Sequence, residues 1–84
     1  MIARSTITFA ELRQLLLGLG FTLSKRGKFW FFEHPPSETT FTFRPYRARE
    51  RVTLVDLHMT RKHLDWRDVL SEQAFDDWLK EVTA

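Results

Sequence analysis

The sequence predicts a small α+β domain, in which helices cover one face of a three-stranded antiparallel sheet. The first observation is the stretch from Gly20 to Pro35, whose two apolar runs are joined by a short basic turn with a glycine, the pattern of a β-hairpin. The second is that apolar residues recur at three- and four-residue spacing on both sides of this stretch, as in amphipathic helices. With 84 residues, of which 43% are apolar, the chain is expected to form one domain, residues 1–84, with one modest core.

A first helix is expected at about residues 8–18. Thr8 and Glu11 have the capping-box pattern, in which each side chain accepts a hydrogen bond from the other residue's backbone N–H. An apolar stripe follows and is expected to lie in the core; it consists of Phe9, Leu12, Leu15, Leu16 and Leu19. Gly20 is a natural end for this helix, because glycine adopts the left-handed conformation without steric cost.

Two strands are expected at about residues 21–26 and 28–34, with Gly27 in the turn between them. In the second strand, alternation places Phe29, Phe31 and Glu33 on one face and Lys28, Trp30, Phe32 and His34 on the other. Both faces carry large aromatic side chains, although helices on one side of the sheet need only one apolar face. The face with Phe29 and Phe31 is therefore expected to be exposed or to meet a partner.

A third strand is expected at about residues 39–44, after the loop Pro35-Pro36-Ser37. The next segment, residues 44–51, has four arginines in eight residues, with a tyrosine among them. Arginine presents a planar fork to phosphate, and tyrosine can stack on a base. We therefore predict RNA contact through the hairpin turn and this segment, by Lys25, Arg26, Lys28, Arg44, Tyr46, Arg47, Arg49 and Arg51. The alternative is a solvated loop.

Two further helices are expected in the second half of the chain. One begins at Thr53, where Thr53 and Asp56 repeat the capping-box spacing, and runs to about residue 64 with Leu54, Leu57 and Leu64 facing inward. The other follows Ser71 and carries the apolar stripe Phe75, Trp78, Leu79 and Val82. Two interpretations of this last helix stay open: it packs on the core, or its acidic face covers the basic surface and limits access of RNA.

The charge is unevenly distributed along the chain. Residues 1–64 carry 11 Lys/Arg against 5 Asp/Glu, or +6, whereas residues 65–84 carry 2 against 6, or −4. Such a basic body with an acidic tail suits binding to a polyanion, or a tail folded against the body. A solvated surface of mixed sign is the alternative.

Several classes of function are not supported by the sequence. The chain has no cysteine, and His34, His58 and His63 lack the spacing of metal ligands, so neither a metal nor another cofactor is expected. No apolar run approaches the roughly 18 residues needed to cross a bilayer, and the start of the chain lacks the apolar region of a signal peptide. We therefore expect a cytoplasmic protein that does not enter the membrane.

In its order of motifs the sequence resembles the HicA (YcfA-like) toxin family. The first helix runs into Leu19-Gly20-Phe21, like the family's Leu-Gly-Phe, and the turn glycine and an aromatic strand ending in His34-Pro35 follow. A further strand, a basic loop and a capped helix complete the match, which covers about residues 8–65; residues 66–84 form a C-terminal helical extension. The resemblance implies the family's double-stranded-RNA-binding-like fold, with the order α-β-β-β-α.

The resemblance also implies a function. Members of the family belong to toxin–antitoxin systems, cleave mRNA as mRNA interferases, and are neutralised by a HicB-type antitoxin. Their signature is Gly-Ser-His just after the first hairpin turn, with the histidine as the catalytic residue. Here the matching positions are Gly27-Lys28-Phe29, and phenylalanine can neither accept nor donate the proton. The sequence thus predicts an RNA-binding member whose nuclease activity is lost or weakened.

Two alternatives arise from the same residues. In the first alternative, the protein is an active mRNA interferase that uses other catalytic residues, and Lys28 and His34 are the candidates. In the second alternative, the protein is a non-catalytic interaction module, in which Phe29 and Phe31 contact an antitoxin-like partner or a second copy in a homodimer.

Overall fold

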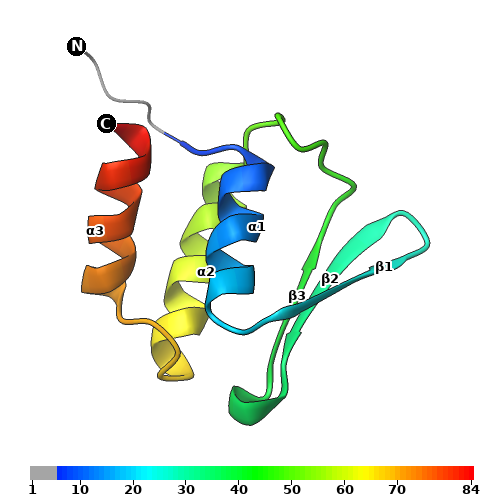
Figure 1. The fold of residues 1–84 in the computed structure, drawn as a ribbon, viewed down its shortest axis with the longest axis horizontal. Coiled ribbons are helices and arrows are strands. Elements are labelled where there is room, and N and C mark those ends of the chain that lie inside the picture. Colours follow the sequence, from blue (N-terminus) through cyan, green and yellow to red (C-terminus); the bar gives the residue numbers. More distant parts are fainter. Residues whose placement is uncertain (1–5) are drawn as a thin grey trace.

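A computed structural model describes residues 6–84. The elements follow one another along the chain as α1 (Phe9–Gly18), β1 (Thr22–Arg26), β2 (Phe29–His34), a short 3-10 turn (Pro35–Ser37), β3 (Thr39–Phe43), α2 (Leu54–Trp66) and α3 (Glu72–Thr83) (Figure 1). The predicted α+β class, with the order helix, three strands, helix and an additional C-terminal helix, is confirmed.

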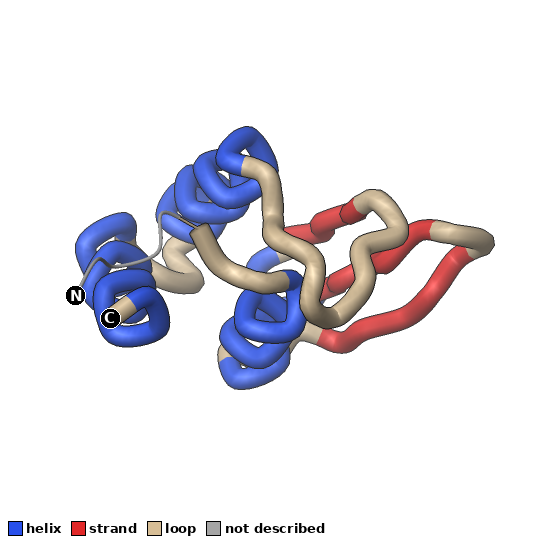
Figure 2. Tube along the Cα trace, turned by 90° about the horizontal axis from the view of Figure 1, so that it is seen from above, coloured by secondary structure: helices blue, strands red, loops and turns tan. Residues whose placement is uncertain are grey.

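The three strands form one antiparallel sheet in the order β1-β2-β3, so β2 is central and the other two are edges. Figure 2 shows all helices on one side of this sheet: α1 and α2 lie next to it, and α3 lies beyond them. The opposite face of the sheet is not covered by any element in the described part of the chain. This open face is the one that the sequence assigned to Phe29 and Phe31.

The core lies between the sheet and the α1–α2 layer. Leu23 of β1, Phe32 of β2 and Phe41 of β3 are directly paired across the strands, so they point to the same helix-covered face. Phe9 of α1 is completely buried at the centre of an aromatic cluster, with ring centroids 5.4–6.1 Å from those of Trp30, Phe32, Phe43 and Tyr46. This cluster joins the first helix, the sheet and the segment after β3.

The helix starts are capped by short polar side chains, as their sequences predict. Thr8 and Glu11 make both bonds of the capping box, and Thr53 accepts a hydrogen bond from the backbone N–H of Asp56. The prediction that Leu54 faces inward is wrong, because its side chain is 57% exposed. Leu54 is the first residue of α2, and it lies at the rim of the gap toward α3 rather than over the sheet.

Helix α3 packs on the helical layer through Phe75, which is fully buried. Arg61 of α2 forms a bidentate pair with Asp76, at 2.8 and 2.9 Å, and its guanidinium also lies 3.3 Å from Glu72. The hydrogen bonds from Arg61 lower the pKa of Asp76. The acidic face of α3 thus meets α2, and Figure 2 shows α3 on the side of the molecule opposite the sheet. The basic hairpin is not covered by α3.

Candidate nucleic-acid interface

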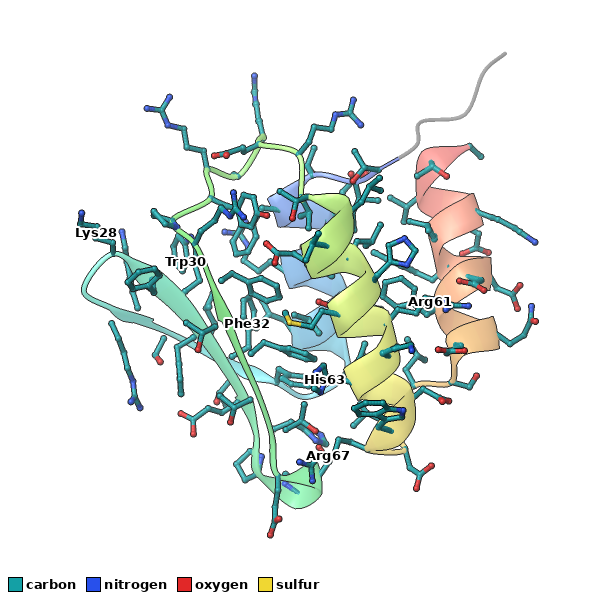
Figure 3. All side chains as sticks on the ribbon, turned by 180° about the vertical axis from the view of Figure 1, so that it is seen from behind. Lys28, Trp30, Phe32, Arg61, His63 and Arg67 are labelled. Atoms are coloured by element: carbon teal, nitrogen blue, oxygen red, sulfur yellow. The ribbon has the colours of Figure 1, made fainter. Side chains whose placement is uncertain are left out.

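The hairpin and the arginine-rich segment 44–51 are held side by side by one tryptophan. The indole Nε1 of Trp30, in β2, donates a hydrogen bond to the backbone carbonyl of Tyr46 at 3.0 Å. The ring of Phe9 stacks on both, with centroid distances of 5.7 Å to Trp30 and 5.4 Å to Tyr46. Figure 3 shows Trp30 on the helix-facing side of the hairpin whose tip carries Lys28. Two basic segments that are distant in the sequence therefore adjoin.

The segment 44–51 is also fixed to the start of α1. The backbone carbonyls of Ala48 and Glu50 accept hydrogen bonds from the N–H groups of Ala10 and Phe9, at 2.9 and 2.8 Å. Within the segment, the backbone N–H of Arg47 donates to the carboxylate of Glu50 at 3.1 Å. The bonds to α1 satisfy N–H groups that the first turn of a helix leaves without partners. As a result, the side chains of this segment project from an anchored backbone.

Tyr46 does not have the role that its sequence context indicated. The residue is 3% exposed, and its hydroxyl donates to the carboxylate of Asp56 at 2.6 Å and accepts from the backbone N–H of Thr53 at 3.1 Å. Its ring stacks on Phe9, and the guanidinium of Arg44 lies 5.5 Å from the ring centroid. The ring therefore has no open face for a base, and Tyr46 stabilises the start of α2 instead.

The predicted cations divide into two groups, of which the first is engaged within the protein. Arg26 lies 4.1 Å above the ring of Phe31 and 3.7 Å from the carboxylate of Glu33. Arg44 is 3.8 Å from Asp56, and Arg51 donates to the backbone carbonyl of Thr6 at 3.1 Å. These contacts hold the three arginines in place and partly neutralise two of them.

The second group comprises exposed cations that form no ion pair within residues 6–84: Lys25, Lys28, Arg47 and Arg49. We call these four residues the basic rim. The ammonium group of Lys25 lies 5.1 Å from the ring centroid of Trp30. This is the same tryptophan whose hydrogen bond to Tyr46 holds the hairpin against the segment 44–51. The basic rim thus comprises four cations without an ion-pair partner, two on the hairpin and two on the segment 44–51 that adjoins it.

The open face of the sheet presents less aromatic surface than the sequence predicts. Phe29 is 49% exposed, but Phe31 is half-buried under the guanidinium of Arg26. Small polar side chains flank them on this face: Thr22 and Ser24 on β1, and Thr40 and Thr42 on β3. Arg26 pairs directly with Phe29 and is therefore the diagonal neighbour of Phe31.

The two candidate catalytic residues lie far apart. Lys28 is at the tip of the hairpin, whereas His34 ends β2, six residues on and about 20 Å away at the usual rise of a strand. His34 lies beside the core, with its ring 5.0 Å from that of Phe21 and its Nδ1 2.7 Å from the hydroxyl of Ser37. Because an acid and a base must both reach one phosphodiester, these two residues do not form a shared site.

Phe29 stands where, by the resemblance of the sequence, a HicA-like motif would have its histidine. It pairs directly with Arg26 across the hairpin, and its side chain lies on the open face next to Phe31. No group that can transfer a proton is present at this position. In residues 6–84, no cluster of three His, Cys, Asp or Glu side chains is placed to hold a metal ion.

Comparison with known proteins adds no relative to these observations. No protein-family model, curated protein or solved structure matches this chain. Within the described residues, no helix has the length and apolar character needed to cross a membrane. The geometry of the interface is therefore the basis on which a function can be assigned.

Replacing Tyr46 with phenylalanine tests the structural role of this residue. The substitution removes the hydroxyl that bonds Asp56 and leaves the N–H of Thr53 without its acceptor, so we expect a loss of about 2 kcal/mol in the free energy of unfolding. Urea denaturation measures this change. Affinity of the folded variant for a labelled single-stranded RNA is expected to equal that of the parent protein. A loss of affinity without a loss of stability would instead assign the hydroxyl of Tyr46 to an interface with RNA.

Proposed function

We propose that this protein is a HicA-like member of a toxin–antitoxin family that binds RNA through the basic rim and has lost or weakened its mRNA-cleaving activity. The observation that carries this proposal is the hydrogen bond from Trp30 to Tyr46, which holds two basic segments side by side. Uncompensated cations on an anchored backbone attract a phosphate chain and release its counterions on binding.

The anchoring of the segment 44–51 favours binding over a merely solvated loop. Loops that must order on binding lose conformational entropy, whereas this segment is already bonded to α1 and to Trp30. Arg47 and Arg49 extend from it without ion-pair partners in the described residues. Their guanidinium groups are available for phosphate oxygens, which arginine contacts in bidentate geometry.

The position of Phe29 supports the second half of the proposal. General acid–base catalysis contributes about 10²–10⁴-fold in rate, and a phenyl ring supplies none of it. Lys28 and His34 do not form a replacement pair, because they lie at opposite ends of β2. Phe29 instead offers an apolar surface on which a base can stack, at about 1–3 kcal/mol per base in single-strand binding proteins.

Substitution of the rim tests RNA binding directly. In an Arg47→Ala/Arg49→Ala variant, we expect weaker binding of a labelled single-stranded RNA and a smaller slope of log K against log [salt], by about 0.7 for each lost phosphate contact. Fluorescence anisotropy between about 50 and 200 mM salt measures both quantities. The matched control is Lys62→Ala/Arg67→Ala, which also removes two exposed cations that form no ion pair among the described residues, near the C-terminal end of α2. Figure 3 shows Arg67 at that end of the helix.

The proposal requires that the control bind as the parent protein does. Equal losses in both variants would indicate attraction by net charge alone, with no defined interface. No binding by the parent protein at about 50 mM salt would contradict RNA binding altogether.

A further inference from the structure

The two edges of the sheet differ in charge. The outer strand β1 ends in Lys25 and Arg26, which are the kind of residues that keep an exposed edge from pairing with another chain. The opposite edge, β3, reads Thr-Thr-Phe-Thr-Phe and has neither a charge nor a proline. No backbone hydrogen bond joins residues 39–43 to any described residue outside β2. This edge is therefore unprotected and available for pairing.

An exposed aromatic side chain at the end of α2, that of Trp66, lies near this edge. Three rings in contact extend from the core to the surface. The ring centroid of His63 lies 6.1 Å from that of Phe41 and 5.4 Å from that of Trp66. Trp66 is 69% exposed, although its side chain is large and mostly apolar. Figure 3 shows α2, with His63, alongside the strand that precedes the segment 44–51. The edge of β3 and the exposed ring of Trp66 together form one surface.

We propose that this surface binds a second copy of the chain, with β3 pairing antiparallel to its own equivalent about a two-fold axis at Phe41. In this register Phe41 lies opposite Phe41 of the second copy, and Thr40 lies opposite Thr42. The two sheets then continue as one six-stranded sheet. The same axis brings the two α2 helices toward each other beside the paired strands, so that Trp66 is covered.

A second copy fits this edge because the strand is complementary to itself. Every cross-strand pair in the register is uncharged, and Thr–Thr and aromatic pairs are among the favourable ones. A pairing of β3 with β1 of another copy is heterologous and continues into rings or open fibres, whereas the two-fold pairing is complete with two copies. Lys25 and Lys28 of the basic rim stay accessible in the dimer, because the hairpin β1–β2 forms the outer end of each half.

Paired lysines on the edge provide the main test. The Thr40→Lys/Thr42→Lys variant places like charges opposite each other across the proposed interface, on a face where both residues are exposed and tolerate the change. The control is Thr22→Lys/Ser24→Lys, which makes the same change on the same face of the β1 edge. Sedimentation equilibrium from about 1 to 100 μM gives the dissociation constant of the dimer for each protein.

The expected result is a dimer for the parent and for the control, and a dissociation constant raised about tenfold or more for the β3 variant. Thermal unfolding followed by circular dichroism verifies that both variants are folded. A parent that stays monomeric at about 100 μM overturns the proposal. So does a dimer that the β3 lysines leave intact but that Phe31→Asp dissociates, because that result assigns the contact to the open face.

Cross-linking tests the register independently of affinity. The chain has no cysteine, so Thr40→Cys and Thr42→Cys each introduce a single thiol. In the proposed register, position 40 of one copy lies directly opposite position 42 of the other, so mild oxidation of an equal mixture is expected to give mainly the mixed disulfide. Homodimeric disulfides in equal or greater yield contradict the register.

Discussion

Replacing Phe29 with histidine is expected to raise the rate of mRNA cleavage by about 10²–10⁴-fold over the parent chain, which is the usual contribution of a positioned general acid or base. This expectation rests on the proposed function, in which the fold and the RNA-binding rim remain and only the proton-transferring group is missing. Phe29 is half-exposed on the open face, so an imidazole fits there without disturbing the core. Cleavage of a labelled mRNA by both purified proteins, at equal concentration and low salt, measures the effect.

The surroundings of this position suit the chemistry. Arg26 is its direct cross-strand neighbour, and Lys28 precedes it in the turn. Cations beside a histidine favour its neutral form, which is the form that accepts a proton. They also stabilise the negative charge that develops on the phosphate in the transition state.

Phe31→His is the matched control, because it places a histidine on the same strand and the same face, two residues from the motif position. Cleavage by the Phe29 variant alone supports a HicA-like protein that has lost its nuclease. Cleavage by the parent contradicts that loss and directs attention to Lys28 and His34. If no variant cleaves while RNA binding persists, the likeness to the family ends at the fold and at RNA binding.

Replacing Phe9 with alanine is expected to have the largest effect on stability, with a loss of about 3–5 kcal/mol in the free energy of unfolding. Phe9 is completely buried and lies against four aromatic rings, so its removal leaves a cavity that rigid neighbours cannot fill. For a domain of this size the loss corresponds to a fall in melting temperature of more than about 12 °C. Differential scanning calorimetry measures both quantities.

Phe29→Ala is the control for this substitution, because it deletes the same atoms from a half-exposed position. We expect it to cost less than about 1 kcal/mol. Similar losses in the two variants would show that the aromatic cluster around Phe9 is not the centre of the core. Under conditions in which the Phe9 variant is still folded, we also expect it to bind RNA more weakly than the parent protein, because Phe9 holds Trp30 and Tyr46 together.

The local structure of this protein is determined by the sequence. The capping pairs at Thr8 and Thr53 predict the starts of two helices, and the alternation in residues 28–34 predicts which side chains share a face of β2. These features depend on contacts between residues close in the chain, and their period is directly visible in the sequence. The class and order of the elements follow from them.

The accessibility of the candidate interface is decided by the tertiary structure. The sequence does not distinguish Tyr46, which is buried against Phe9 and Asp56, from Arg47 and Arg49, which are exposed. It also does not reveal that Trp30 joins the hairpin to the segment 44–51, or that β3 rather than β1 presents the uncharged edge beside α2. Each of these depends on which distant segments pack together, and the free energy that selects such packing belongs to the whole core rather than to any one segment.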